Sequence, residues 1–202
     1  MRYLALGDSY TIGEGVPAGG DWPSQLARAL RDDDIPVDDP RIIATTGWTT
    51  DELSAAMDAA EPLGQWDCVS LQIGVNNQYR GRDLDDYCRE FEGLLERAIK
   101  LARGTTPRVL VLSIPDWGVT PFGAGSERDL VQVSRELDGY NAAACALCEG
   151  HGVAFVDITG ISRARGAEPA MLVDDGLHPS AAMYALWVAR ALPVARALLA
   201  DA

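Results

Sequence analysis

Residues 1–10 read MRYLALGDSY, a short apolar run followed at once by Gly, Asp and Ser. The run Tyr3–Leu6 has the length of a strand and no polar alternation, which is typical of a strand buried on both faces of a parallel sheet. Such sheets bind their ligands beyond the carboxyl ends of the strands. The sequence therefore predicts that Ser9 lies where this fold binds a ligand.

The rest of the chain repeats this alternation of apolar runs and helical patterns. Strands are predicted at 3–6, 42–44, 68–73, 109–114 and 153–156. Helices are predicted at 22–30, 49–60, 84–102, 130–148 and 180–199, and Pro193 is expected to kink or break the last one. The alternation indicates right-handed crossovers and a three-layer α/β/α sandwich. We expect one α/β domain over residues 1–202 with a five-stranded parallel sheet.

The composition disfavours several classes of function. The 202-residue chain is 48% apolar and carries a formal net charge of -13. Such acidity repels phosphate backbones and anionic lipids, so we expect no nucleic-acid partner and no stable membrane association. The apolar run after Met1-Arg2 is too short for a signal peptide, and no stretch approaches the length of a membrane span. These features predict a cytoplasmic protein.

Four cysteines are present, and two of them, Cys145 and Cys148, form a C-x-x-C pair. The pair lies late in a helical pattern rather than at a helix start after a strand, which disfavours a redox motif. A zinc knuckle would need a second pair of ligands at similar spacing, and the sequence has none. We expect reduced cysteines that pack as small apolar residues.

The histidines are the candidate bases, because a serine hydroxyl is a weak nucleophile that needs a base within hydrogen-bond reach. The chain has two. His151 lies at a helix-to-strand turn, at the opposite edge of the sheet, and is interpreted as an exposed turn residue. His178 lies in a loop that can return to the edge with Ser9. Asp175, three residues ahead, is placed to hold the imidazole tautomer, and Asp174 competes for that role.

Donors for an oxyanion are the remaining requirement for ester cleavage. The candidates are the backbone N–H groups of Ser9 and Gly47 and the side-chain amide of Asn76, each of which follows a predicted strand. Turn formation would explain Gly47 alone, and an Asx turn would explain Asn76 alone. Their positions after successive strands favour one shared role.

These landmarks resemble the four sequence blocks of the SGNH family, also called GDSL hydrolases. The blocks are Gly7-Asp8-Ser9, Gly47, Gly74-x-Asn76 and Asp175-x-x-His178, in family order. The resemblance implies a flavodoxin-like sandwich without metal or cofactor. It also implies an esterase, lipase, thioesterase or carbohydrate acetylesterase activity.

The resemblance assigns roles residue by residue. It implies Ser9 as nucleophile, Asp175 and His178 as the rest of the triad, and Gly47 and Asn76 as oxyanion donors beside the Ser9 N–H. Asp8 is interpreted as a brace for the turn, because Asp175 takes the role of the triad acid. Asn77 stands where the family more often has Asp, which predicts different hydrogen bonds in that loop.

Four aromatic residues are candidate substrate contacts. Trp48 and Tyr79 neighbour the oxyanion blocks, and Trp117 and Phe122 lie on a Gly/Pro-rich loop after the fourth predicted strand. Such a loop would wall an apolar acyl pocket or act as a lid, or its aromatics would only anchor it to the core. We expect a small soluble carboxylic ester, with an acetyl or short- to medium-chain acyl group, cleaved through an acyl-enzyme.

Other functions stay open at this point. An SGNH acyltransferase, thioesterase or lysophospholipase would use the same residues. A non-enzymatic flavodoxin-like binding domain would need a phosphate loop after the first strand, where Asp8 and Glu14 would oppose a phosphate. A receiver domain would need a functional lysine, but Lys100, the only lysine, lies in a predicted helix.

Overall fold

The computed structural model describes residues 1–200; the last two residues of the predicted domain lie outside the described part. Five parallel strands form one sheet in the order β2-β1-β3-β4-β5, which confirms the predicted sheet. All residues of β1, β3 and β4 are buried, as their largely apolar sequences indicate, and β3 also buries the polar Ser70 and Gln72. The strands are β1 Tyr3–Gly7, β2 Arg41–Ala44, β3 Cys68–Gln72, β4 Val109–Leu112 and β5 Ala154–Val156.

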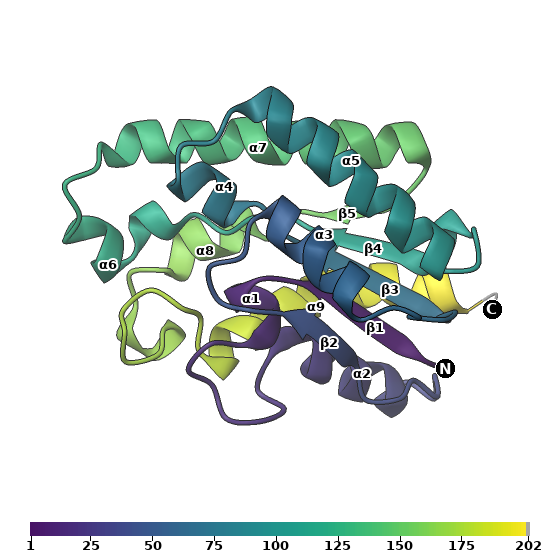
Figure 1. The fold of residues 1–202 in the computed structure, drawn as a ribbon. Coiled ribbons are helices and arrows are strands. Elements are labelled where there is room, and N and C mark those ends of the chain that lie inside the picture. Colours follow the sequence, from purple (N-terminus) through teal and green to yellow (C-terminus); the bar gives the residue numbers. More distant parts are fainter. Residues whose placement is uncertain (201–202) are drawn as a thin grey trace.

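Helices cover both faces of the sheet and give the predicted three layers (Figure 1). One layer contains α3, α5 and α7, and the other contains α2 and α9. The α-helices are α1 Ser9–Ile12, α2 Trp22–Asp32, α3 Thr50–Ala59, α4 Val75–Tyr79, α5 Leu84–Leu101, α6 Pro121–Ala124, α7 Leu130–His151, α8 Thr159–Arg165 and α9 Ala181–Leu199. Three 3-10 turns lie at η1 Thr106–Arg108, η2 Trp117–Val119 and η3 Pro169–Met171.

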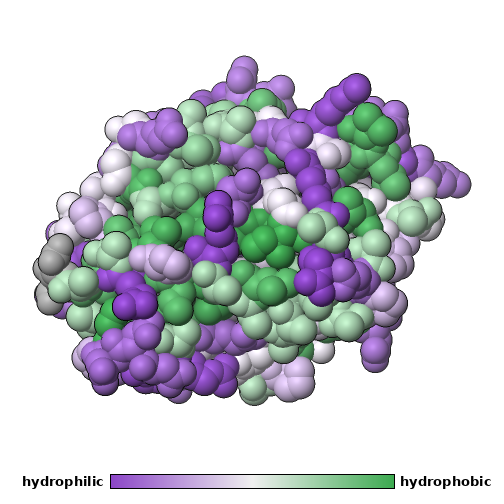
Figure 2. Space-filling view, turned by 180° about the vertical axis from the view of Figure 1, so that it is seen from behind, coloured by the Kyte–Doolittle hydropathy of each residue, from purple (hydrophilic) through white to green (hydrophobic). Residues whose placement is uncertain are grey.

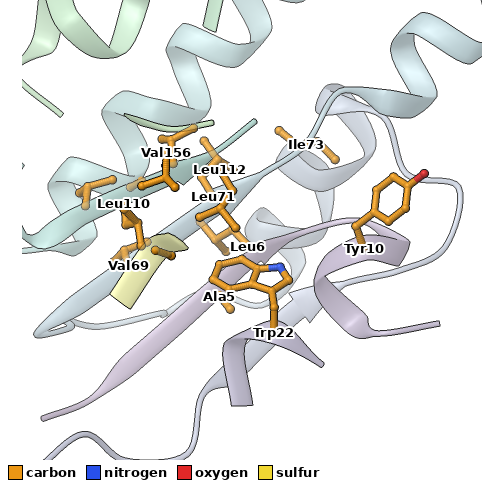
Figure 3. Close-up of a cluster of buried hydrophobic side chains, with 14 of the residues drawn as sticks. Ala5, Leu6, Tyr10, Trp22, Val69, Leu71, Ile73, Leu110, Leu112 and Val156 are labelled. Carbon is orange, nitrogen blue, oxygen red and sulfur yellow. The ribbon is translucent and has the colours of Figure 1, made fainter. Parts of the chain in front are cut away.

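The core lies between the sheet and these helices (Figure 3). Leu6, Leu71 and Leu112, from three different strands, belong to one buried cluster that Trp22 of α2 joins. The indole N–H of Trp22 donates to the Gln72 side chain at 2.9 Å, so the one polar group of this ring is satisfied. This packing holds the carboxyl ends of the strands in place. The residues of the site follow those ends along the chain.

The last two long helices differ from the predictions at single residues. Gly150 does not end α7, which extends past its predicted limit of 148 to His151 and is capped by Gly152, whose φ is 67°. Nor does Pro193 break α9, which runs unbroken from Ala181 to Leu199. Buried residues lie on both sides of the proline, at Ala191 and Ala195. Their packing holds the helix together although the proline removes one backbone donor.

The helix α9 also corrects the expectation that no stretch approaches a membrane span. By length and composition alone it would suffice to cross a membrane, and it is the one such helix within residues 1–200. It packs against β4, β5 and α2, and its fully buried residues include Tyr184 and Trp187. Figure 2, which shows the molecule from behind, has apolar side chains interspersed with hydrophilic ones. Of the apolar window of α9, 39% is buried, so the core that it covers accounts for part of its apolar character.

Candidate active site

Ser9 is the first residue of α1, immediately beyond the end of β1. Asp8 caps this helix, because its side chain accepts a hydrogen bond from the N–H of Tyr10 at 3.0 Å. The N–H of Ser9 itself lies in the first turn, where backbone donors have no partner inside the helix. The turn thus presents both a hydroxyl and a backbone donor that has no partner in the described part of the chain, with Asp8 as its brace.

His178 is held by a carboxylate in the loop before α9. Asp175 Oδ1 accepts the backbone N–H groups of Leu177 at 2.8 Å and of His178 at 2.9 Å. Its Oδ2 lies 2.5 Å from Nδ1 of the imidazole. Because an ionised carboxylate can only accept, Nδ1 carries the proton and Nε2 keeps its lone pair. His178 is therefore oriented as a general base, and the exposed Asp174 makes no such bond within the described residues.

The carboxylate of Asp175 is kept ionised by the same contacts. Partial burial alone would raise its pKa, but hydrogen bonds from the His178 ring and from two backbone N–H groups outweigh burial and lower the pKa below its usual value. The negative charge is thus present at neutral pH, where it would stabilise the imidazolium that forms when His178 takes a proton.

The oxyanion candidates lie on two neighbouring turns. Gly47 has a φ of 88°, a conformation that favours glycine, and no hydrogen bond within the described residues uses its N–H. Asn76 lies in the first turn of α4 and donates one amide N–H to the Trp48 carbonyl at 2.9 Å, and its second N–H has no partner among residues 1–200. At the cap of α4, Gly74 has a φ of 128°, and a Cβ there would lie 2.6 Å from the Tyr87 ring.

These groups converge on one cavity of about 190 Å³. Within the described residues no hydrogen bond joins the Ser9 hydroxyl to His178, although both line the cavity; such bonds often tighten only when a substrate is bound. Of the predicted substrate contacts, Trp48 is absent from the lining and packs against the core instead, and of the predicted triad Asp175 lies behind His178, outside the lining. The lining consists of Ser9, Tyr10, Thr46, Gly47, Val75, Asn76, Tyr79, Trp117, Phe122, Leu177 and His178.

Three of the predicted aromatics form one wall of the cavity. The ring centroids of Tyr79 and Trp117 are 5.3 Å apart, and that of Phe122 lies 6.4 and 6.1 Å from the two. Trp117 is only 2% exposed, and its indole N–H donates to Gln78 at 2.9 Å. Trp117 therefore anchors the loop and also lines the cavity. Tyr79 and Phe122 are the two exposed members of the wall.

Sequence reasoning missed four lining residues, namely Tyr10, Thr46, Val75 and Leu177. Each is the direct neighbour of a residue in the predicted blocks. Their position next to these blocks could have identified them as lining residues, because a turn that presents one residue to a cavity often presents the next one as well.

Two further residues singled out by the sequence, His151 and Asn77, make defined contacts in the structure. His151 is the last residue of α7 and is partly buried, not an exposed turn residue, and its Nε2 lies 3.1 Å from Glu92. Asn77, which differs from the usual family residue, accepts the N–H of Thr50 at 3.1 Å and donates to its hydroxyl at 2.6 Å. This amide pins the start of α3 to α4, next to the Gly47 turn.

The cysteines lie apart from this cavity lining. All four carry free thiols, and Cys68 and Cys148 are buried. Cys145 and Cys148 both lie within α7, as the helical pattern predicts. Among residues 1–200, no three His, Cys, Asp or Glu side chains gather where they could hold a metal ion.

A serine beside an imidazole that a carboxylate orients, at the carboxyl edge of a parallel sheet, is the arrangement of a serine hydrolase. The comparisons with known proteins define the class further. The chain belongs to the GDSL-like lipase/acylhydrolase family, whose model matches residues 5–186. No curated protein sequence matches the chain.

Several solved structures share this fold over nearly the whole chain. TesA has a TM-score of 0.76 at 18% identity and covers 98% of this chain and 100% of its own. The acetylxylan esterase Axe2 from Geobacillus stearothermophilus has a TM-score of 0.71 at 21% identity, with 96% and 93% covered. The psychrotrophic esterase EstA from Pseudoalteromonas sp. has a TM-score of 0.67 at 15% identity, with 99% and 94% covered. At these identities the likeness establishes the fold.

Replacing Asp8 by Asn is expected to stabilise the protein at alkaline pH. Burial raises the pKa of Asp8 to about 7, whereas an unfolded Asp titrates near ~3.9. Between these values the native state keeps a proton that the unfolded state has lost, so the stability that Asp8 contributes falls as the pH rises towards 7. Asn keeps the oxygen that caps Tyr10 but carries no charge.

Thermal unfolding at pH 5 and pH 8 tests this expectation. The Asp8→Asn protein should have the higher Tm at pH 8, and the difference should shrink at pH 5. A Tm difference that is the same at both pH values would contradict it. If Asp8 is a brace, the variant should also keep hydrolase activity within a few-fold of the wild type.

Proposed function

We propose that this protein is a serine esterase that hydrolyses small carboxylic esters through an acyl-enzyme intermediate. The observation that carries the proposal is the imidazole of His178, held at Nδ1 by Asp175 and lining one cavity with Ser9. The donors at Gly47 and Asn76 line the same cavity. A nucleophile, a base and oxyanion donors are the parts that acyl transfer requires.

The proposed reaction has two steps. Nε2 of His178 takes the proton of the Ser9 hydroxyl while the oxygen attacks the ester carbonyl. The N–H groups of Ser9 and Gly47 and the free amide N–H of Asn76 stabilise the negative oxygen. His178 then protonates the departing alkoxide and leaves an acyl group on Ser9. Water, activated by His178 in turn, attacks this acyl group and releases the acid.

The dimensions of the cavity favour a small acyl group. Its volume of about 190 Å³ is below the roughly 300–1,000 Å³ of pockets that hold drug-sized ligands. The aromatic wall of Tyr79, Trp117 and Phe122 offers apolar contact to an acetyl or short acyl chain. The similar structures include an acetylxylan esterase and an esterase inhibited by monoethylphosphonate. The net charge of -13 supports a soluble ester over a nucleic acid or an anionic lipid surface.

A panel of p-nitrophenyl esters from acetate to laurate tests the proposal with purified protein. We expect kcat/KM to be highest for the short chains and to fall for the long ones. An added alcohol acceptor reports on the fate of the acyl group, since a hydrolase releases mainly the free acid. Mainly transesterified product would identify an acyltransferase instead.

The Phe122→Ala variant should move the optimum of this panel towards longer acyl chains, because it removes one of the two exposed rings of the aromatic wall and widens the cavity there. Phe122 is 39% exposed and Leu84, which is not in the cavity lining, is 37% exposed. Leu84→Ala is therefore the matched control and should leave the chain-length profile unchanged. A profile that Phe122→Ala leaves unchanged would argue against the wall as the acyl site.

A further inference from the structure

The turn that carries Gly47 is held only weakly by its own backbone. Between Thr45 and Thr49 the one backbone hydrogen bond within the turn runs from the Trp48 N–H to the Thr45 carbonyl, and at 3.3 Å it is longer than usual. Gly47 itself has a φ of 88°, where glycine has wide conformational freedom. The direction of its N–H must therefore be fixed by contacts from outside the turn.

Two side chains from the neighbouring segment supply such contacts. Arg80, the C-terminal cap of α4, donates from Nη2 to the Gly47 carbonyl at 2.6 Å. Asn76, one turn earlier, donates to the Trp48 carbonyl at 2.9 Å. The two carbonyls that directly follow the Gly47 N–H are thus both held from α4, the helix that also supplies the amide of the oxyanion site.

Glu52 orients Arg80 from the other side. Its carboxylate lies 3.3 Å from Nη1 of Arg80, and it also accepts the N–H of Thr49 at 2.9 Å as part of the capping box of α3. The side chains of Arg80 and Glu52 are 48% and 41% exposed. Ion pairs this exposed contribute little to folding stability, so the contact has no strong structural purpose.

We propose that Arg80 is a positioning residue of the oxyanion site, an inference that rests on the proposed esterase function. Its hydrogen bond holds the peptide group after Gly47 and so restrains the backbone rotations of Gly47 that would turn the Gly47 N–H away from the cavity. A preorganised donor acts mainly when negative charge develops on the carbonyl oxygen. Loss of Arg80 therefore lowers kcat and kcat/KM together and leaves KM nearly unchanged.

The test compares Arg80→Ala with Arg82→Ala. Arg82 lies two residues further on, pairs with Asp51 and Glu90, and makes no hydrogen bond to the Gly47 turn within the described residues. Arg80→Ala should lower kcat on p-nitrophenyl acetate by about 10- to 100-fold, a fraction of the effect of removing an oxyanion donor itself. Arg82→Ala should stay within twofold of the wild type, and both variants should keep a similar Tm.

Two further readouts separate positioning from a general structural role. Benzeneboronic acid forms a tetrahedral adduct with a catalytic serine, and its inhibition constant should rise in Arg80→Ala by about the factor by which kcat falls. Arg80→Lys should recover only part of the rate, because an ammonium lacks the planar fork that reaches Gly47 and Glu52 together.

Equal kcat values for the Arg80→Ala and Arg82→Ala proteins, or a rise in KM alone, would overturn the proposal. Ser9→Ala is measured alongside them. Activity that survives Ser9→Ala refutes the esterase mechanism itself. An inactive Ser9→Ala protein together with a fully active Arg80→Ala protein refutes only the role of Arg80.

Discussion

Ser9→Ala protein is expected to lose ester hydrolysis almost completely, with kcat falling by about 10⁵- to 10⁶-fold, as when other serine hydrolases lose their nucleophile. Without the hydroxyl no acyl-enzyme forms, and the oxyanion donors can only assist direct attack by water. The fold should be unaffected, because the hydroxyl of Ser9 makes no hydrogen bond within the described residues. The measurement is the hydrolysis rate of p-nitrophenyl acetate at saturating substrate.

A control for this prediction is Ser24→Ala. Ser24 lies on α2, outside the cavity lining, and its replacement should leave kcat unchanged. A phosphonate ester should label the wild-type protein at one site, found by mass spectrometry in the peptide that contains Ser9, and should fail to label Ser9→Ala. If the Ser9→Ala protein keeps more than a hundredth of the wild-type rate, another group is the nucleophile.

His178→Ala is expected to cost nearly as much, with kcat falling by roughly 10⁴- to 10⁶-fold. Without the imidazole the Ser9 hydroxyl has no base, because Asp175 reaches the reacting groups only through this ring. Removing either the nucleophile or its base disables the same step, so the double variant should be no slower than either single variant. This strong non-additivity distinguishes a triad from two independent contributions.

The second histidine provides the matched control. His151 is paired with Glu92 and does not line the cavity. We expect His151→Ala to keep the wild-type kcat and the wild-type pH profile on p-nitrophenyl acetate. A loss of activity in this variant that equals the loss in His178→Ala would contradict the assignment of His178 as the base.

Much of the fold could be predicted because a buried strand or helix face has a recognisable apolar pattern within its own few residues. The run Tyr3–Leu6 has no polar residue, and the structure makes it a buried strand with a neighbour on each side, β2 and β3. The short helices α1 and α4 were not predicted, because four or five residues are too few to show a helical period. The prediction that Pro193 breaks the last helix was wrong for a different reason. The packing on both sides of the proline outweighs the lost hydrogen bond.

Part of the candidate site could likewise be predicted from the sequence, and part could not. Ser9, Gly47 and Asn76 each follow a strand directly, so the topology alone brings them to one edge of the sheet. The proximity of Asp175 and His178 follows from a spacing of three residues in a tight turn. By contrast, nothing in the sequence distinguishes Trp48 from the aromatics of the cavity wall, since all of them follow predicted strands.

By itself, then, the sequence determined the alternation of strands and helices, the edge at which Ser9 lies, and the pairing of its base with an acid. Only the tertiary structure decided that Trp48 turns to the core while Phe122 faces the cavity. It alone also brings Arg80 to the Gly47 carbonyl, 33 residues away along the chain. The physical reason is that apolar patterns and short spacings act within one element, whereas these contacts depend on how separate elements pack against one another.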